Sequence, residues 1–381
     1  MAEAGHIRSL TSLRFFAASA IVLGHGASPS FSPVRSLIVD VRPAVSFFFV
    51  LSGFILSYTY DGRMKELGYR NFFVARCARL WPIHAVTASL AIVFLVWPTT
   101  SQGGTAALAR LMGNLLLIQS FTPWRDWYFS FNAVSWSIST EMAFYAAFPL
   151  LIGVIQRRWA VVAAGAAAWL AAVLAFAVMW DLPTQEVAPG LSAWSLLYIS
   201  PVTRIIEFIA GMLAFVAFKS LRVAVPRVAY GSATMLEICA VLACLGAMLV
   251  CTGIGRYGTA LPPQTRIWVL TCGPFIVFAG ALVVFARQEG GLSHLLQTTP
   301  LVYLGEISFA LYMLHQIVVR YIAGNFWQQA SVHPWAFYAT YWILSLVGAA
   351  LLFELVEKPG RSLIRRKFSA PRGTAVPVSA A

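Results

Sequence analysis

The 381-residue chain is 59% hydrophobic and only 11% charged, which lies well outside the composition of soluble globular domains. This excludes a soluble enzyme and predicts a protein embedded in a lipid bilayer. The formal net charge of +13 is explained by basic loops that face the cytosol and anionic lipids, so it requires no nucleic-acid partner.

Ten apolar windows run along the chain, each near the roughly 20 residues that a helix needs to cross a bilayer. A transmembrane β-barrel would instead show shorter, alternating segments. The first window is no secretory signal peptide, because Arg14 and His25 interrupt it. We therefore expect an all-α polytopic membrane protein of about ten transmembrane helices. The windows are residues 10–27, 44–60, 80–97, 136–155, 159–180, 202–218, 228–251, 268–285, 301–322 and 335–355.

A weaker apolar stretch at 106–121 carries Arg110, Asn114 and Gln119. Its length fits a span, a re-entrant segment or an interfacial helix. If it does not cross and the N-terminus is cytosolic, every basic cluster lies on the cytosolic side, as the positive-inside rule requires. If it crosses, the basic C-terminal cluster lies outside. We therefore expect ten spans, one short re-entrant or interfacial helix and two cytosolic termini.

The domain organisation is simple. No internal repeat or appended soluble domain is visible, so we expect residues 1–367 to form a single membrane-embedded domain. Residues 368–381 are rich in alanine, serine and proline and are expected to be a disordered cytosolic tail. The five cysteines lack metal-ligand spacing, and no metal site is expected.

Ionisable side chains inside a span cost roughly 3 kcal/mol or more each at its centre, so they are candidates for function. Arg14 and His25 are eleven residues apart, which places them within about 20° on one helical face and roughly 16 Å apart along the axis. Snorkelling of Arg14 and packing of His25 at the outer interface would explain both without a function. A neutral histidine, however, is well suited to accept a proton from a hydroxyl group.

The window at 301–322 carries a second polar face. Ser308, Tyr312 and His315 lie at i, i+4 and i+7, a pattern that fits either a site or hydrogen bonds between helices. Arg204 and Glu207 are three residues apart and are expected to form a local ion pair.

A third polar group opens the window at 136–155, where Trp136 and Ser137 are followed by Glu141. Ser137 and Glu141 lie one helical turn apart. A buried carboxylate here would orient an imidazole, act as a base or neutralise an arginine. Glu237 has no evident partner in the sequence.

Two arginines, Arg76 and Arg79, stand at the cytosolic entrance to the third window. At this spacing they would grip a phosphate-bearing ligand at the membrane face. The positive-inside rule also predicts arginines there without any ligand.

In chain order, these fragments resemble the acyltransferase 3 family of membrane acyltransferases over nearly the whole sequence. The order is Arg14 and His25, FFVLSGF at 48–54, R-x-x-R-L-x-P at 76–82, W-S-x-x-x-E at 136–141, S-x-x-x-Y-x-x-H at 308–315 and E-K-P at 357–359. The resemblance implies a ten-helix enzyme with an acyl-CoA co-substrate, commonly acetyl-CoA, and no tightly bound cofactor. The implied acceptors are surface glycans, lipid-linked sugars or related molecules.

The resemblance also implies roles for individual residues. Arg14 and His25 match the catalytic pair of such enzymes, and Arg76 and Arg79 match the pair associated with the donor. Glu141 and the polar residues at 308–315 match positions without a settled role. Many relatives have an acidic residue at position 46, where this chain has serine, and an aromatic residue at position 84, where it has histidine.

These observations lead to a hypothesis for the mechanism. The arginine pair and Arg14 hold the donor phosphates at the inner face, while His25 deprotonates the acceptor hydroxyl or relays the acyl group. Glu141 or the face from Ser308 to His315 orients His25. Direct transfer and a covalent acyl-enzyme are both compatible with the sequence. The expected location is a bacterial inner membrane, and the expected partners are acyl-CoA, a carbohydrate or lipid-linked acceptor and membrane lipids.

Two other classes of protein remain open from the sequence. A transporter or flippase would use buried arginine, histidine and glutamate residues to line a substrate or proton path through the same helices. A structural or scaffolding membrane protein would use them only to specify helix packing. A scaffolding role would explain each of these residues by itself, but it would not explain the order in which the motifs follow one another along the chain.

Overall fold

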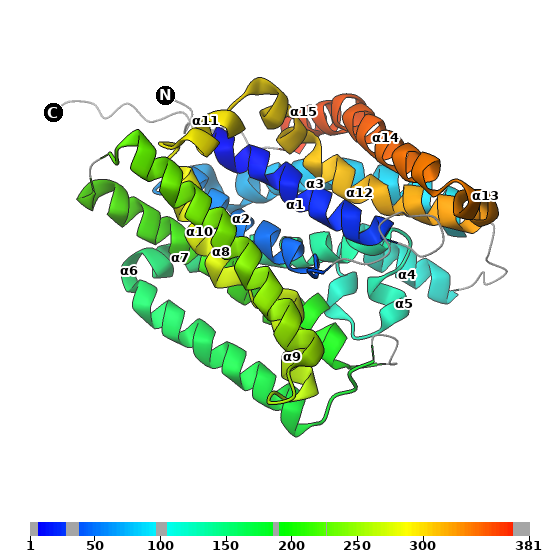
Figure 1. The fold of residues 1–381 in the computed structure, drawn as a ribbon, viewed down its shortest axis with the longest axis horizontal. Coiled ribbons are helices and arrows are strands. Elements are labelled where there is room, and N and C mark those ends of the chain that lie inside the picture. The colour runs from blue at the N-terminus through cyan, green and yellow to red at the C-terminus, as the bar shows by residue number, and fades with distance from the viewer. Residues whose placement is uncertain (1–6, 28–37, 97–104, 186–189, 226, 369–381) are drawn as a thin grey trace.

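The computed structural model describes residues 7–27, 38–96, 105–185, 190–225 and 227–368, and this part of the chain contains helices and no strand. Figure 1 shows the helices as one bundle. Of the predicted tail at 368–381, Phe368 is the last residue of helix α15 (Lys358–Phe368), and residues 369–381 lie outside the described residues. The helices are α1 (Arg8–Gly26), α2 (Pro43–Tyr60), α3 (Met64–Ala91), α4 (Thr105–Leu115), α5 (Arg125–Tyr128), α6 (Trp136–Met179), α7 (Pro201–Ala224), α8 (Tyr230–Tyr257), α9 (Pro263–Cys272), α10 (Phe275–Ala286), α11 (Gly291–Leu296), α12 (Thr299–Asn325), α13 (Trp327–Val332), α14 (Pro334–Leu352) and α15 (Lys358–Phe368).

Eight helical stretches of the described residues are long and apolar enough to cross a membrane. They are α2, α3, α6, α7, α8, α9 with α10, α12, and α14 with α15. The described residues are therefore all-helical, as composition predicts. They contain eight stretches that could cross a membrane, fewer than the ten predicted windows.

Two features account for the difference from ten. The stretch Ala133–Met179 has 47 residues, about 70 Å at 1.5 Å per residue, or more than twice the hydrocarbon thickness. The backbone of Arg158 within it is not helical, and the part of α6 after this kink forms the lower edge of the bundle in Figure 1. The other feature is α1, which is 19 residues long but polar in its first half, with Arg8 and Arg14.

The stretch predicted at 106–121 does not form one long helix. It consists of the 11-residue α4, a turn and a short 3₁₀ segment, Gln119–Phe121. Helix α4 would extend only about 16 Å, half of the hydrocarbon thickness. The C-terminal end of α4 contacts α3, where Nε2 of His84 lies 2.9 Å from the carbonyl oxygen of Asn114.

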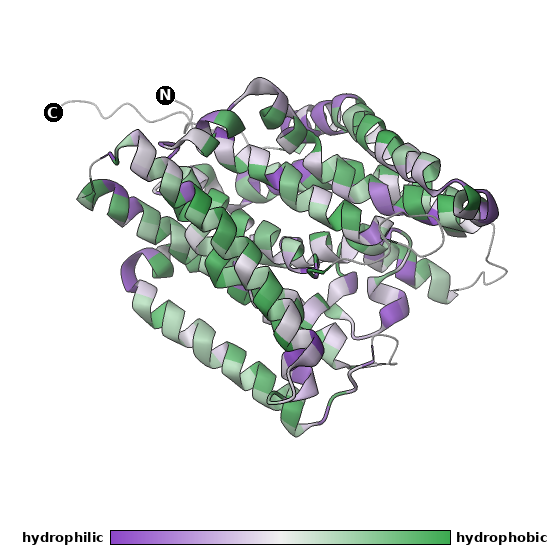
Figure 2. Cartoon of the chain, viewed as in Figure 1, coloured by the Kyte–Doolittle hydropathy of each residue, from purple (hydrophilic) through white to green (hydrophobic). Residues whose placement is uncertain are grey.

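Helices α6 and α8 present apolar side chains outward. Only 6% of the most apolar window of α8 is buried, and Leu242, Leu245 and Leu249 are among its exposed residues. Figure 2 shows hydrophobic residues along the outer surfaces of both helices. Such an exposed apolar surface is stable in lipid and would aggregate in water.

Close helix pairs form the interior. Helices α2 and α7 meet at Gly53 and Gly211, where an added Cβ would overlap backbone atoms of the facing helix. Helices α1 and α12 meet in the same way, because a Cβ on Gly305 would overlap the backbone of Thr11. Small residues at such crossings let the backbones of membrane helices approach closely. The second pair brings His25 and His315 together.

Candidate active site

Two cavities lie among the inner helices. The first has a volume of about 90 Å³ and is lined by Arg14, Arg76, Arg79 and Glu141 together with apolar side chains. The second has a volume of about 670 Å³ and contains His25. Arg14 lies in the first half of α1 and His25 in its last turn, so the two cavities lie at different levels along this helix. We call them the inner and the outer cavity.

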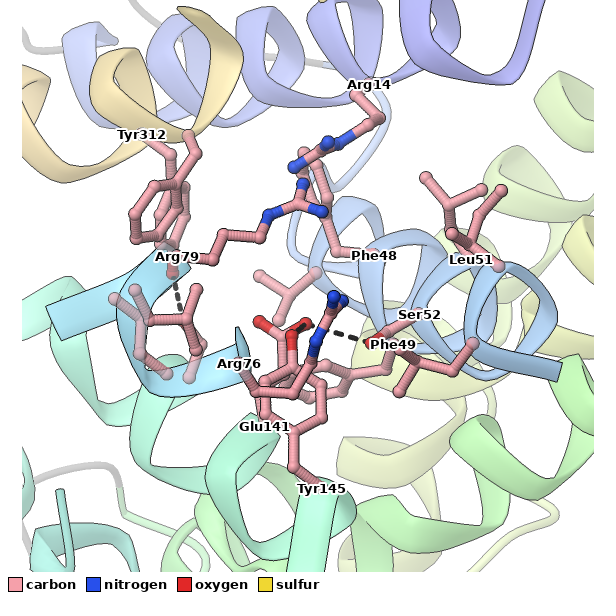
Figure 3. Close-up of a pocket in the computed structure, with 17 residues that line it drawn as sticks. Arg14, Phe48, Phe49, Leu51, Ser52, Arg76, Arg79, Glu141, Tyr145 and Tyr312 are labelled. Carbon is pink, nitrogen blue, oxygen red and sulfur yellow. Dashed lines mark hydrogen bonds between the residues drawn. The ribbon is translucent and has the colours of Figure 1, made fainter. Parts of the chain in front are cut away.

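The inner cavity gathers charged residues from three helices (Figure 3). Arg14 enters from α1, Arg76 and Arg79 from α3, and Glu141 from α6. Arg76 is 8% exposed, and its Nη2 donates a hydrogen bond of 3.0 Å to the hydroxyl of Tyr60. Arg14 and Arg79 repel each other, and Glu141 attracts Arg14. The lining thus carries three cationic groups and one carboxylate, which favours an anionic ligand.

Two hydroxyl groups fix the carboxylate of Glu141. Ser52 Oγ donates to Oε1 at 2.9 Å, and the hydroxyl of Tyr145 donates to the same atom at 2.5 Å. Figure 3 shows Ser52 and Tyr145 beside Glu141, with Arg76 next to its carboxylate and Arg79 and Arg14 above it in the view. Glu141 therefore neutralises part of the arginine cluster, and it lies in the cavity that does not contain His25.

His25 contacts His315 instead. Nδ1 of His25 lies 2.8 Å from Nε2 of His315, and the rings are nearly parallel. His315 is fully buried, whereas His25 is exposed to the outer cavity. Of the residues expected to orient His25, the structure brings His315 into contact with it.

The hydrogen bonds define which nitrogen atoms carry protons. Nδ1 of His315 lies 3.2 Å from the carbonyl oxygen of Leu311, which only accepts hydrogen bonds, so this nitrogen is the donor. Nε2 of a neutral His315 is then an acceptor, and Nδ1 of His25 donates to it. This assignment leaves Nε2 of a neutral His25 without a proton and available as a base.

The two cavities share two lining residues, Val45 and Tyr312. The hydroxyl of Tyr312 lies 2.8 Å from Ser137 Oγ and 3.1 Å from the carbonyl oxygen of Val134. Trp136 lines the outer cavity and Ser137 the inner one. The side chain of Tyr312 thus stands where the two cavities meet.

Ser308 belongs to neither of these two cavities. Its hydroxyl is buried and donates to the carbonyl oxygen of Gly305, one turn earlier in the same helix, at 2.7 Å. Of the three polar residues predicted to share a face of this helix, Tyr312 and His315 therefore carry groups that meet other helices.

Two carboxylates outside the cavities have structural partners. Arg204 Nη1 lies 3.0 Å from Glu207 Oε1, so the predicted local ion pair is confirmed. Glu237, which had no evident partner, accepts hydrogen bonds of 3.1 Å from the backbone N–H groups of Gly290 and Ser293. Its carboxylate therefore caps the first turn of α11.

Sequence reasoning missed several site residues. Tyr145 lies one helical turn after Glu141, which was a usable signal, and Ser52 lies within the FFVLSGF segment. Asp40 and the arginines of the outer cavity gave no such signal. They lie on loops and helix ends, separated by up to 280 residues, and only the fold assembles them: Asp40, Arg42, Arg125, Arg256 and Arg320.

The chain is similar to known proteins along nearly its whole length. A family model described as an acyltransferase domain matches residues 7–354. The chain is 32% identical over 384 residues to Acyltransferase MdmB of Streptomyces mycarofaciens, covering 94% of this chain and 92% of that protein. It is 24% identical over 402 residues to Nodulation protein 10 of Rhizobium leguminosarum bv. viciae, covering 96% and 98%. No solved structure matches the chain.

Proposed function

Because the chain belongs to the acyltransferase 3 family and is an acyltransferase, we propose that it moves an acyl group from acyl-CoA, with acetyl-CoA as donor, to a hydroxyl group of a cell-surface or lipid-linked carbohydrate. The observation that carries this proposal is the pair of cavities that meet at Tyr312, with arginines in one and His25 in the other. Because the chain belongs to a family of acyltransferases, the alternative of a transporter without enzymatic activity is set aside.

The donor enters the inner cavity. Arg76 and Arg79, with Arg14, bind the phosphate groups of CoA, because guanidinium groups form strong, charge-assisted hydrogen bonds to phosphate. Glu141, fixed by Ser52 and Tyr145, holds the arginines in place. The acylated arm of the donor extends towards Tyr312.

The acceptor enters the outer cavity, and His25 is its general base. Nε2 of His25 accepts the proton of the acceptor hydroxyl, whose oxygen attacks the thioester carbonyl carbon. The new C–O bond forms, the C–S bond breaks, and the proton passes to the departing thiolate of CoA. The Tyr312 hydroxyl, beside Ser137, donates to the carbonyl oxygen of Val134 in this structure, and it turns to the thioester carbonyl oxygen as negative charge develops there. His315 positions His25.

The membrane arrangement follows from the same scheme. Ten crossings result when α1 and the second half of α6 are added to the eight apolar stretches. Both termini are then cytosolic, and the arginine pair of α3 faces the cytosolic pool of acyl-CoA. Helix α15 supports this orientation, because it packs against α3 and brings Arg361 close to Arg79. The proposed location is a bacterial inner membrane.

The test uses radiolabelled acetyl-CoA and membranes of the native host that contain the chain. Label appears in an alkali-labile ester of the carbohydrate or lipid fraction when the wild-type chain is present. A His25→Ala variant that inserts equally well lowers the rate about 10²–10⁴-fold, the usual contribution of a general base. Transfer at the wild-type rate by this variant would overturn the assigned base, and no transfer by the wild type would overturn the proposed function.

A further inference from the structure

The outer cavity carries far more positive charge than a hydroxyl-binding site needs. Its lining includes four arginines and one carboxylate, Asp40. This gives a formal charge of +3 within the cavity that contains His25. A cavity with one sign of charge and low-dielectric walls concentrates ligands of the opposite sign.

Membrane topology does not account for these arginines. The positive-inside rule explains basic residues at the cytosolic end of a bundle and disfavours them at the other. Within the described residues, seven arginines and no lysine lie towards the outer end. Arg204 is paired with Glu207, and four of the other six line this cavity: Arg42, Arg125, Arg256 and Arg320. The other two, Arg110 and Arg266, do not. Arginine is the residue that binds phosphate and carboxylate groups with two parallel hydrogen bonds.

Asp40 positions two of these arginines without cancelling their combined charge. Nε of Arg42 lies 2.9 Å from Oδ1 of Asp40, and its Nη2 lies 2.6 Å from Oδ2. Nη2 of Arg256 lies 3.9 Å from the same Oδ2. The carboxylate is 7% exposed, whereas the side chains of Arg42 and Arg256 are 34% and 37% exposed. One buried anion therefore orients two cations whose surfaces still face the cavity.

The other two arginines are held by uncharged partners. The guanidinium of Arg125 lies over the ring of Phe129, 5.5 Å from its centroid. Nη1 of Arg320 donates a long hydrogen bond of 3.4 Å to the carbonyl oxygen of Phe131. These contacts position the side chains but supply no opposite charge. The outer cavity therefore favours a ligand that carries a negative charge.

We infer that the acceptor carries an anionic group, a phosphate or a carboxylate, in the same molecule as the hydroxyl group that is acylated. This inference rests on the proposed function and adds the chemical class of the acceptor. The arginines bind the anion, and the hydroxyl then lies at His25. A lipid-linked sugar phosphate and an acidic saccharide both supply this chemistry.

The first experiment examines the labelled product from native-host membranes after free acetyl-CoA has been removed. We expect it to bind an anion-exchange column at neutral pH and to elute with salt. Partition between organic solvent and water then separates a lipid-linked phosphate from a soluble acidic saccharide. Ester-linked label in the unbound, neutral fraction would overturn the inference while leaving the proposed acyl transfer intact, and no label at all would overturn the proposed function.

The second experiment uses the purified full chain in lipid nanodiscs, with the acceptor fraction from the anion-exchange column. Arg320→Gln raises the KM for this acceptor about tenfold or more, because the anion loses a charge-assisted hydrogen bond. The KM for acetyl-CoA stays unchanged, and Arg320→Lys restores part of the acceptor affinity. Arg110→Gln, at the same end but outside the cavity, is the matched control. An increase in the KM for acetyl-CoA, or equal acceptor effects in both Gln variants, would overturn the inference.

Discussion

Nδ1 of His25 and Nε2 of His315 lie 2.8 Å apart, although 290 residues separate them in the sequence. The contact exists because α1 and α12 pack closely along their length. His315 also contacts the carbonyl oxygen of Leu311, so its second nitrogen is left to accept from His25. The pair therefore presents one unprotonated nitrogen to the outer cavity.

The first prediction concerns the orientation of His25. His315→Leu removes the acceptor for Nδ1–H of His25, so we expect kcat to fall at least about tenfold, part of the roughly 10²–10⁴-fold that general-base catalysis provides. His315→Gln restores part of the loss, since its side-chain oxygen accepts the same hydrogen bond. Steady-state kinetics would show an unchanged KM for acetyl-CoA. Equal losses in two well-folded variants would exclude the positioning role.

The second prediction concerns donor binding. Arg79→Gln removes a cation from the inner cavity, and we expect the KM for acetyl-CoA to rise about tenfold or more. Arg79→Lys keeps the charge and recovers part of the affinity. Arg70→Gln is the control, because Arg70 is exposed on the same helix outside the cavity. An unchanged KM in Arg79→Gln would remove this residue from the donor site.

The third prediction concerns the hydroxyl at the meeting point of the two cavities. Tyr312→Phe is expected to lower kcat, because the hydroxyl beside Ser137 no longer stabilises the developing oxyanion. Tyr341→Phe is the matched control, since its buried hydroxyl donates to the carbonyl oxygen of Val22 at 2.9 Å. Each variant loses a hydrogen bond, so we expect each to lose about 1 kcal/mol of stability. Thermal unfolding measures this loss. A similar kcat in both variants would assign Tyr312 a structural role only.

The fourth prediction concerns the crossing of α1 and α12. Gly305→Ala introduces a Cβ that overlaps the backbone of Thr11, and we expect it to cost about 1–3 kcal/mol of stability. Activity falls with it, because the same crossing holds the two histidines together. Gly280→Ala has open space around its Cβ and should leave the melting temperature unchanged or slightly raised. Equal melting temperatures for both variants would contradict the packing argument.

Much of the fold was predictable because hydropathy is a local property. The windows at 44–60 and 202–218 correspond closely to α2 and to the first part of α7. The window at 268–285 is instead divided into α9 and α10 at Gly273 and Pro274. This Gly-Pro pair is a helix-breaking signal that the apolar run obscured.

Helix α3 shows the limit of a hydropathy prediction. It begins at Met64, sixteen residues before the predicted window, with a kink at Gly68, whose backbone is not helical. The basic segment after this kink is helical and continues into the apolar run. Hydropathy predicts which part of a helix lies in lipid, but it does not predict the residue at which the helix begins.

The site was predictable only in part. Motif order singled out Arg14, His25, Arg76, Arg79 and Glu141, but it did not separate them into two cavities. That separation depends on which helices are neighbours, and no local pattern records it. The contact of His25 with His315, rather than with Glu141, follows from the packing of α1 on α12. The outer arginines come from four distant segments and carry no motif.

In the proposed reaction, donor and acceptor reach the site from opposite ends of the bundle. This arrangement is tested with sealed inside-out and right-side-out membrane vesicles. Radiolabelled acetyl-CoA, which does not cross the bilayer, is added outside them. We predict labelled acceptor with inside-out vesicles, whose exposed surface is the cytosolic face, and label with right-side-out vesicles only after they are permeabilised. Equal labelling of both kinds of intact vesicle would contradict entry of donor and acceptor from opposite ends.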